Sequence, residues 1–280
     1  MSRVTFLDAP LGGMKQGSTI EVEYDLPTEQ WYFDQNGHPT MPFCVLMEAA
    51  LQPCGWLASY VGSARTSEID LLFRNLDGTG TFTDEIIPVG GILRTRVTLV
   101  SISQTAGMII ETFKVEQFIG DKSVFTMSTV FGFFPKEAFE NQAGLPVSDE
   151  ARARIDAPSD FFVDLTERPA RYCDRAPRLA GPMLLMLDRV TGYWPEGGRA
   201  KLGYLRAEKT VDPDEWFFKA HFFQDPVQPG SLGIEAMCQL LQFYMLERDM
   251  GAGLAHPHFE PVMLGRAVTW KYRGQVVPKT

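Results

Sequence analysis

The residues best suited to chemistry lie between His221 and Gln239, where a histidine, a Pro-Gly turn and a carboxylate occur in one short stretch. Histidine moves protons near neutral pH. The turn Pro229-Gly230-Ser231 precedes an apolar run that predicts a helix, and the first N–H groups of a helix have no partner within it. Those groups and the positive end of the helix dipole can hold a developing oxyanion on a thioester carbonyl. Gly230 has no side chain to block that approach.

The carboxylate of this stretch is Glu235, four residues before Gln239. That spacing places both side chains on one face of a helix, so the amide can orient the carboxylate. A Glu on an apolar helix face is seldom buried without a partner or a purpose. A histidine and a carboxylate facing one acyl pocket can remove an α-proton and protonate a β-hydroxyl leaving group. The residues therefore indicate dehydration of a 3-hydroxyacyl thioester, with His221 as a catalytic residue and Gly230 and Ser231 positioning the substrate.

A weaker copy of the stretch lies upstream, at residues 41–52. Glu48 and Gln52 repeat the acid and amide, but no histidine stands at the matching position. Three further segments match in order at a nearly constant offset, namely 2–13 with 188–198, 26–33 with 211–218 and 81–88 with 271–278. Ordered matches of this kind predict an internal duplication.

The duplication predicts two modules of one α+β class, each with a long helix on an antiparallel sheet. We expect helices at 44–60 and 231–247, with Pro53 kinking or interrupting the first. We expect strands at 18–24, 80–87, 92–103, 108–119, 123–134 and 200–205. The expected domains are module 1 (1–140, without a catalytic histidine), a Pro-, Asp- and Arg-rich linker with solvated arginines (141–178), and module 2 (179–280, with His221). Module 2 has no counterpart of the last three strands of module 1, so we expect it to be incomplete at its C-terminus.

Composition excludes several classes of protein. The 280 residues carry a net charge of -9, which argues against non-specific binding to nucleic acid, and 45% are hydrophobic, which supports a large core. No apolar run approaches the roughly 20 residues that span a membrane, and the N-terminus lacks the pattern of a signal peptide. The cysteines show no metal-type spacing, which predicts reduced thiols in a cytoplasmic protein and no metal site. They are Cys44, Cys54, Cys173 and Cys238. The other three histidines have the sequence context of loops and turns.

These residues and motifs carry a resemblance to a known family. The pattern His-Phe-x-x-Asp-Pro-Val-x-Pro-Gly-x-Leu-Gly from His221, followed by an acid, closely resembles the FabA-like 3-hydroxyacyl-[acyl-carrier-protein] dehydratases of the hotdog fold. The tail at 265–278 resembles them too. The duplicated layout is similar to the dehydratase regions of polyunsaturated fatty acid synthases, which are large multidomain proteins related to polyketide synthases. The resemblance implies a double hotdog, with two antiparallel sheets each wrapped on a central helix.

The resemblance also implies roles for particular residues. In hotdog dimers of this family the histidine of one hotdog acts with the acid of the other, so His221 is expected to pair with Glu48, held by Gln52. Glu235 would then face a second site that has Asp34 in place of a histidine, and it is the less favoured acid. FabA-type enzymes have Asp where this chain has Glu. Dehydration is therefore expected, with limited double-bond isomerisation.

The resemblance implies a hydro-lyase that needs no metal or redox cofactor, because acid and base suffice to eliminate water. Its substrate would be carried on the phosphopantetheine of an acyl carrier protein, with docking residues expected among Arg266, Lys271 and Arg273. We expect a segment of a larger synthase that can also form a homodimer, with no nucleic-acid partner and no membrane span. Two alternatives stay open, a hotdog acyl thioesterase and a non-catalytic scaffold module.

Overall fold

The chain is described by a computed structural model over residues 1–63, 65, 67–140, 142 and 144–279. Its contacts divide into two compact units. Unit 1 is Met1–Gln30, Thr40–Gly144 and Pro261–Gly274, and unit 2 is Trp31–Pro39, Leu145–Glu260 and Gln275–Thr280. The expected linker start at residue 141 and module end at residue 280 lie outside the described residues.

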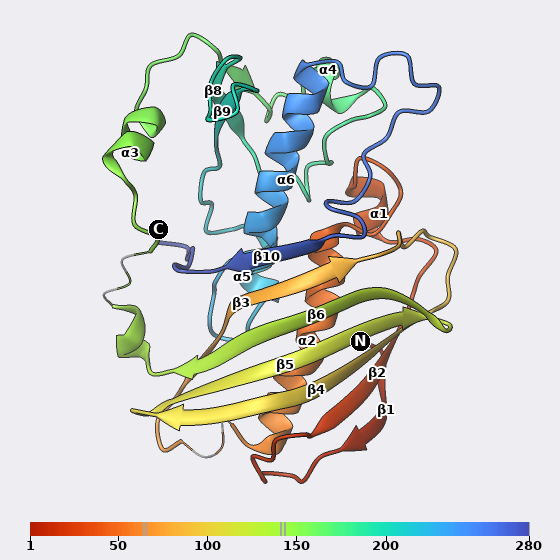
Figure 1. Ribbon diagram of the computed structural model, residues 1–280, viewed down its shortest axis with the longest axis vertical. Coiled ribbons are helices and arrows are strands. Elements are labelled where there is room, and N and C mark those ends of the chain that lie inside the picture. The colour runs from red at the N-terminus through yellow and green to blue at the C-terminus, as the bar shows by residue number, and fades with distance from the viewer. Residues whose placement is uncertain (64, 66, 141, 143, 280) are drawn as a thin grey trace. The chain divides into compact units, whose positions relative to one another are not determined.

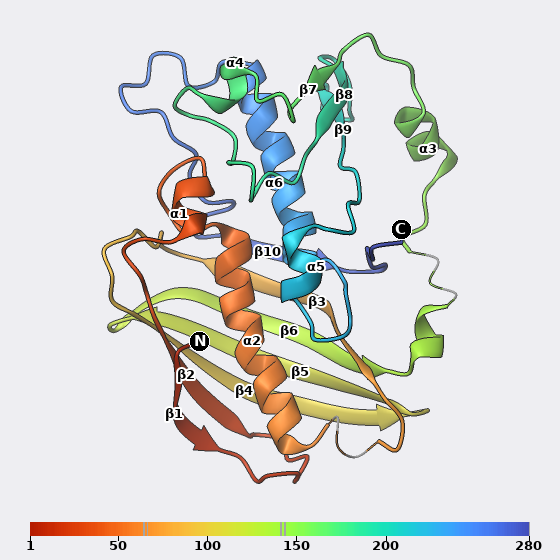
Figure 2. The ribbon, with the colours of Figure 1, turned by 180° about the vertical axis from the view of Figure 1, so that it is seen from behind.

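Unit 1 is a seven-stranded antiparallel sheet with one long helix, α2 (Phe43–Val61), lying across its face (Figures 1 and 2). The strand order is β1-β2-β4-β5-β6-β3-β10. Their bounds are Arg3–Asp8 for β1, Thr19–Asp25 for β2, Leu72–Phe82 for β3, Ile92–Thr105 for β4, Met108–Ile119 for β5, Lys122–Phe134 for β6 and Ala267–Lys271 for β10. A short 3-10 helix, η1 (Lys136–Phe139), follows β6. This arrangement is the hotdog expected for module 1.

The core of unit 1 lies between α2 and the sheet. Leu46, Met47 and Leu57 of α2 are fully buried, as is Phe113 of β5. Burial alternates along β4 and β5, as expected for strands with one face toward a core. The helix continues through Pro53, so the expected interruption does not occur.

The helix α2 ends where Gly62 adopts a left-handed conformation, with φ of 105°. Glycine takes this conformation without the steric cost that a Cβ brings. The N–H of Ser63 then bonds the carbonyl of Ala58 at 3.1 Å, which satisfies one of the last carbonyls of the helix.

Strand β3 lies earlier in the chain than the sequence predicts, because residues 83–87 of the expected strand at 80–87 are not in a strand. It contains two glycines that aromatic rings cover. A Cβ on Gly78 would lie 2.3 Å from Cζ2 of Trp270, and one on Gly80 would lie 2.8 Å from Cζ of Phe125. Glycine in a strand interior often marks such a close approach. The pairing of β3 with β10 and β6 therefore requires both glycines.

The two strands β3 and β10 are equivalent in the internal repeat, and they pair with each other. Residues 81–82 match 271–272, so Thr79 is the counterpart of Thr269, 190 positions later. These two threonines are direct partners at the centre of the antiparallel register. Each strand therefore pairs with its repeat equivalent in the symmetric register. This pairing places a local two-fold axis between the two threonines.

Unit 2 is built around a second long helix, α6 (Gly230–Glu247), and a three-stranded antiparallel sheet in the order β7-β8-β9. The strands are Val163–Asp164, Arg189–Trp194 and Tyr204–Glu208. Four short helices complete it, namely α1 (Trp31–Gln35), α3 (Asp149–Ile155), α4 (Ala170–Cys173) and α5 (Trp216–Ala220). The chain is thus α+β, with the helix and sheet of a hotdog in each module. In the described part of unit 2, no strands correspond to β4, β5 and β6.

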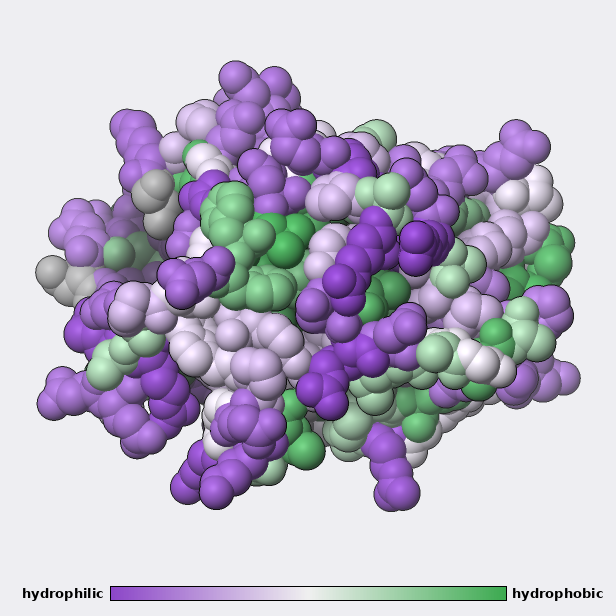
Figure 3. All heavy atoms as spheres, turned by 90° about the horizontal axis from the view of Figure 1, so that it is seen from above, coloured by the Kyte–Doolittle hydropathy of each residue, from purple (hydrophilic) through white to green (hydrophobic). Residues whose placement is uncertain are grey.

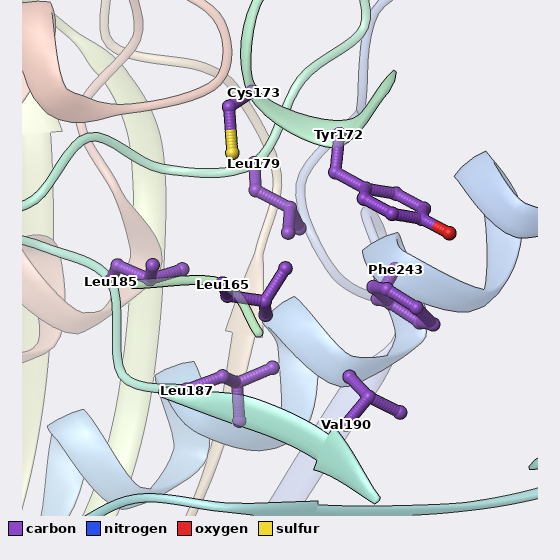
Figure 4. Close-up of a cluster of buried hydrophobic side chains, with 8 residues drawn as sticks. All are labelled: Leu165, Tyr172, Cys173, Leu179, Leu185, Leu187, Val190 and Phe243. Atoms are coloured by element: carbon purple, nitrogen blue, oxygen red, sulfur yellow. The ribbon is translucent and has the colours of Figure 1, made fainter. Parts of the chain in front are cut away.

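The core of unit 2 includes residues from the expected linker (Figure 4). Tyr172 stacks on Phe243 of α6 with ring centroids 4.6 Å apart. The full cluster is Leu165, Tyr172, Cys173, Leu179, Leu185, Leu187, Val190 and Phe243. The observed units therefore differ from the sequence-based boundaries, because a few widely spaced apolar side chains suffice to anchor this segment.

Two arginines of the same segment, Arg168 and Arg178, are only half-buried and differ from the expectation that solvent surrounds them. Arg152, Arg171 and Arg175 are exposed as expected. Arg178 donates to the backbone oxygens of Asp34 and Asn36 at 3.0 and 2.9 Å. Arg168 donates to the carbonyl of Ala180 at 2.8 Å. These bonds tie 168–180 to its own unit, including the 31–39 segment that lies in unit 2.

The helices α2 and α6 differ in how far their apolar faces are covered. Ala50 and Cys54 of α2 are fully buried, whereas their repeat counterparts Met237 and Leu241 are 66% and 54% exposed.

In Figure 3 hydrophobic surface appears as separate areas among hydrophilic side chains. Among the described residues, neither α2, α6 nor any other helix is long and apolar enough to cross a bilayer.

Candidate functional site

His221 follows directly after α5, and its ring is held by the loop that leads to α6. Its backbone N–H bonds the carbonyl of Phe217 at 3.0 Å, which closes the end of the helix. Its Nδ1 lies 2.9 Å from the carbonyl oxygen of Val227. A carbonyl oxygen only accepts, so Nδ1 carries a proton. A neutral ring with this bond is the tautomer whose Nε2 has the free lone pair.

The turn before α6 is fixed by backbone bonding and burial. The N–H of Gln228 bonds the carbonyl of Val276 at 2.9 Å, and Pro229 is the residue before the helix. Gly230 begins α6, and Ser231 is buried. The first turn of a helix directs its N–H groups outward along the axis. The helix α6 therefore begins at the turn that the sequence singles out, and the role of its first N–H groups stays a prediction.

Glu235 and Gln239 form a buried pair on α6. Nε2 of Gln239 donates to Oε1 of Glu235 at 2.9 Å and to the carbonyl of Leu184 at 2.8 Å, and its Oε1 accepts from the N–H of Met186 at 2.7 Å. The amide thus connects the carboxylate to the segment before β8. Burial first, and then the charge of Glu235, raise the pKa of the neighbouring Cys238 thiol to about 12.

Glu48 occupies the equivalent place on α2, with different surroundings. It is half-buried. Gln52 is exposed, and its Oε1 accepts a long hydrogen bond (3.5 Å) from the amino group of Met1. The two Glu-Gln pairs of the repeat therefore differ, because the amide of α6 is buried in a bonding network whereas that of α2 faces solvent.

Tyr272 of unit 1 carries a buried hydroxyl that the motifs of the sequence do not reveal. Its hydroxyl oxygen is buried and makes no hydrogen bond with any residue that the structure describes. Burial first, and then the charge of Glu48, raise the pKa of this hydroxyl well above its usual range. The repeat contains the signal that reveals it, because the counterpart of Tyr272 is Phe82. A hydroxyl is thus present at this repeat position only in the later strand.

The counterpart of His221 in module 1 is Asn36. Helices α1 and α5 have five residues each, and the residue after each makes the same backbone bond, Asn36 to Tyr32 at 3.2 Å and His221 to Phe217 at 3.0 Å. The local offset is therefore 185, and Asn36 replaces Asp34 in the sequence-based assignment. Both assignments leave the equivalent position without a histidine.

Helices α1 and α5 also contact each other through repeat-equivalent residues, as β3 and β10 do in unit 1. The rings of Trp31 and Trp216 meet edge to face with centroids 5.3 Å apart. Both rings belong to unit 2. Each unit therefore holds one pair of equivalent residues in contact, the threonines of β3 and β10 in unit 1 and the tryptophans of α1 and α5 in unit 2.

The three basic residues expected to receive a carrier protein have different surroundings. Arg266 and Lys271 are exposed. The guanidinium of Arg273 donates to the carbonyls of Leu76 and Tyr272 at 3.3 and 2.9 Å, so it supports the end of β10. All three residues are exposed, and their role with a partner stays a prediction.

The remaining histidines and cysteines form no further site among the described residues. The rings of His38 and His258 stack with centroids 4.6 Å apart. All four cysteines are free and buried. In the part of the chain that the structure describes, no group of three or more His, Cys, Asp or Glu side chains could hold a metal ion.

Fold and site together define a double-hotdog protein in which two equivalent helices each carry a Glu-Gln pair and one module alone supplies the histidine. The FabA-like domain model matches residues 1–128 and 179–280. The chain belongs to this family. His221 and Glu48 lie in different units, so their pairing stays a prediction.

Comparison with curated proteins finds a protein of the polyunsaturated fatty acid synthase of Thraustochytrium sp., 33% identical over 285 residues. The match covers 94% of this chain and 18% of that protein, so the chain spans less than a fifth of its relative. Among solved structures, a variant of the fluoroacetyl-CoA-specific thioesterase FlK matches with 13% identity and a TM-score of 0.36, covering 45% of this chain and 98% of the other. A putative thioesterase from Shewanella oneidensis matches with 14% identity and a TM-score of 0.31, covering 42% and 76%.

Proposed function

We propose that this chain is a dehydratase that eliminates water from a 3-hydroxyacyl thioester to give a 2-enoyl thioester. The observation that carries the proposal is the bond from Nδ1–H of His221 to the carbonyl of Val227, which leaves Nε2 as a base at the start of the His-Phe-x-x-Asp-Pro-Val-x-Pro-Gly run. Membership of the FabA-like family and the similarity to part of a polyunsaturated fatty acid synthase support it.

In the proposed reaction Nε2 of His221 takes the proton from C2 of the acyl chain. The electron pair of that C–H bond forms the C2=C3 double bond, and the C3–O bond breaks. Glu48 gives its proton to the departing hydroxyl, which leaves as water. Bonds from helix N–H groups at Gly230 and Ser231 stabilise the negative charge that develops on the thioester oxygen.

The substrate is proposed to arrive on the phosphopantetheine of an acyl carrier protein in the cytoplasm. Such carriers are acidic, and Arg266 and Lys271 are exposed cations available to meet one. Opposite charges on two surfaces raise the rate of encounter and set orientation. The larger synthase implied by the relative would supply that carrier.

Mass spectrometry of a 3-hydroxyacyl chain on a carrier protein tests this function. Loss of one water from the intact acyl carrier is the expected result, and the position of the double bond in the same product reports any isomerisation. Release of the free hydroxy acid would show a thioesterase instead. Unchanged substrate with a carrier that still binds would show a scaffold module.

A further inference from the structure

We propose that Phe222 is a positioning residue for the base, and that the face of its phenyl ring stabilises the positive charge that the imidazole of His221 gains when Nε2 takes the substrate proton. This inference rests on the proposed function and adds a residue to it. It concerns two neighbouring residues of unit 2.

The rings of His221 and Phe222 are in direct contact. Their centroids lie 4.0 Å apart, and the ring planes are tilted by 34°. Aromatic rings in proteins usually pair with centroids about 4.5–7 Å apart. A shorter separation, with planes closer to parallel than to perpendicular, places the imidazole over the face of the phenyl ring.

Two hydrogen bonds fix the imidazole against this face. The backbone N–H of His221 bonds the carbonyl of Phe217 at 3.0 Å, and Nδ1 lies 2.9 Å from the carbonyl oxygen of Val227. Phe222 is half-buried, whereas the next residue, Phe223, is 90% exposed. The loop therefore keeps one of its two phenylalanines on the base and leaves the other in solvent.

The partner of Nδ1 gives the phenyl face its electrostatic role. Val227 offers a backbone carbonyl, which accepts a hydrogen bond but carries no net charge. In serine hydrolases a carboxylate in that place stabilises the imidazolium. A phenyl ring carries negative charge density on its face and attracts a cation within about 6 Å of its centroid. The face of Phe222 supplies this attraction as His221 becomes charged, so it lowers the barrier to proton removal.

A fluorinated ring at position 222 separates this role from simple packing. In 3,4,5-trifluorophenylalanine the ring keeps nearly the same shape, but fluorine draws electron density away from its face. In the full chain we expect this exchange to reduce kcat by about threefold to tenfold with KM within about twofold, because the attraction acts on the charge formed during reaction. Phe222→Leu is expected to lose at least as much. Phe222→Tyr keeps the ring face and is expected to keep kcat within about twofold.

The same exchanges at position 223 are the matched control. Phe223 is the adjacent residue of the same type, and it is so exposed that its replacement leaves the packing intact. We expect kcat and KM of the 223 variants to stay within about twofold of the wild type. Equal losses at positions 222 and 223, or a trifluorinated ring at 222 with wild-type kcat, would overturn the proposal.

Proton NMR tests the contact without turnover. A proton over a phenyl face is shielded by the ring current, so the Cε1–H resonance of His221 is expected to move downfield in Phe222→Leu and to stay in Phe223→Leu. A resonance that ignores Phe222→Leu would contradict the contact. If it moves in a protein that forms no enoyl product, the contact stands and the proposed dehydratase function is wrong. The two failures are therefore distinguishable.

Discussion

The hydroxyls of Thr79 and Thr269 lie 3.0 Å apart across β3 and β10. The two residues are equivalent in the internal repeat, and they are partners in the middle of an antiparallel pair. A residue that meets its own copy marks a two-fold relation, as in the self-complementary interfaces of symmetric dimers. The duplication is thus present in the strand register as well as in the sequence.

This strand pairing predicts a strong effect of Gly78→Ala. The new methyl would lie 2.3 Å from Cζ2 of Trp270 and 2.9 Å from the carbonyl of Ser128, so β3 or β10 has to shift. We expect a loss of about 1–3 kcal/mol in the free energy of unfolding of unit 1. Chemical denaturation monitored by tryptophan fluorescence measures it. Gly274→Ala is the control, because its nearest neighbour would be 4.0 Å away. Equal stability of the two variants would contradict the observed register.

The two Glu-Gln pairs predict unequal consequences of one substitution. Gln239→Ala removes bonds to Glu235, Leu184 and Met186, all made by a fully buried amide. We expect it to cost about 3 kcal/mol, because buried polar groups lose their partners. Gln52→Ala is expected to be nearly neutral, since Gln52 is exposed. Hydrogen exchange of α6 and α2 measures both effects. A Gln52→Ala variant as unstable as Gln239→Ala would show that the pairs are alike.

A buried carboxyl in unit 1 predicts how stability changes with pH. Glu111 of β5 is fully buried and accepts a hydrogen bond from Ser63. Burial, partly offset by that bond, raises the pKa of Glu111 from 4.5 to about 7. Between these values the folded state holds a proton that the unfolded state has lost, so the free energy of unfolding falls as pH rises, by about 3 kcal/mol in total. Above pH about 7 this contribution stays constant.

Glu111→Gln is expected to flatten that decline, because the amide is neutral at every pH. Glu116→Gln on the same strand serves as the control, since Glu116 is paired with Lys114 at 3.1 Å. Denaturation of the wild type and both variants from about pH 5 to 8 gives the slopes. A wild-type decline that persists unchanged in Glu111→Gln would assign it to other groups.

The long helices and most strands of unit 1 could be predicted from the sequence, whereas β3 could not. The expected helices at 44–60 and 231–247 differ by one residue at most from each observed end, because apolar runs of that length favour helix. The expected strand at 108–119 is observed without change. Residues 72–79 contain Asp77 and Gly78, a turn-like pair by composition. They form a strand because they pair with β6 and with β10, a strand nearly 200 residues away whose Trp270 covers the glycine.

For the site, too, features set by spacing within the sequence could be predicted, whereas contacts between distant segments could not. The His221 stretch and both Glu-Gln pairs could be found from spacing alone. The Val227 carbonyl that fixes the ring, and the burial of the Tyr272 hydroxyl, could not, because each depends on where the backbone turns. The correction from Asp34 to Asn36 has a similar origin, since a single offset applied to the whole repeat misses a change in loop length before Pro42.

The assignment of the acid predicts different results for the two glutamates. Glu48→Gln is expected to reduce kcat by about 100-fold or more, in the range typical of a lost general acid. Glu235→Gln is expected to keep kcat within about tenfold, because the position matching His221 on its side is Asn36. Timed product analysis on one batch of acyl carrier compares them. The reverse order would move the acid to Glu235 and make module 2 a self-contained site.

The most direct test of the account is the rate of water loss from a 3-hydroxyacyl carrier in wild type and His221→Ala, followed by mass spectrometry of the intact carrier. The account predicts that the wild type forms the enoyl product and that His221→Ala forms it at least about 100 times more slowly while still binding the carrier. Equal rates in the two proteins would contradict the central claim that His221 is the base.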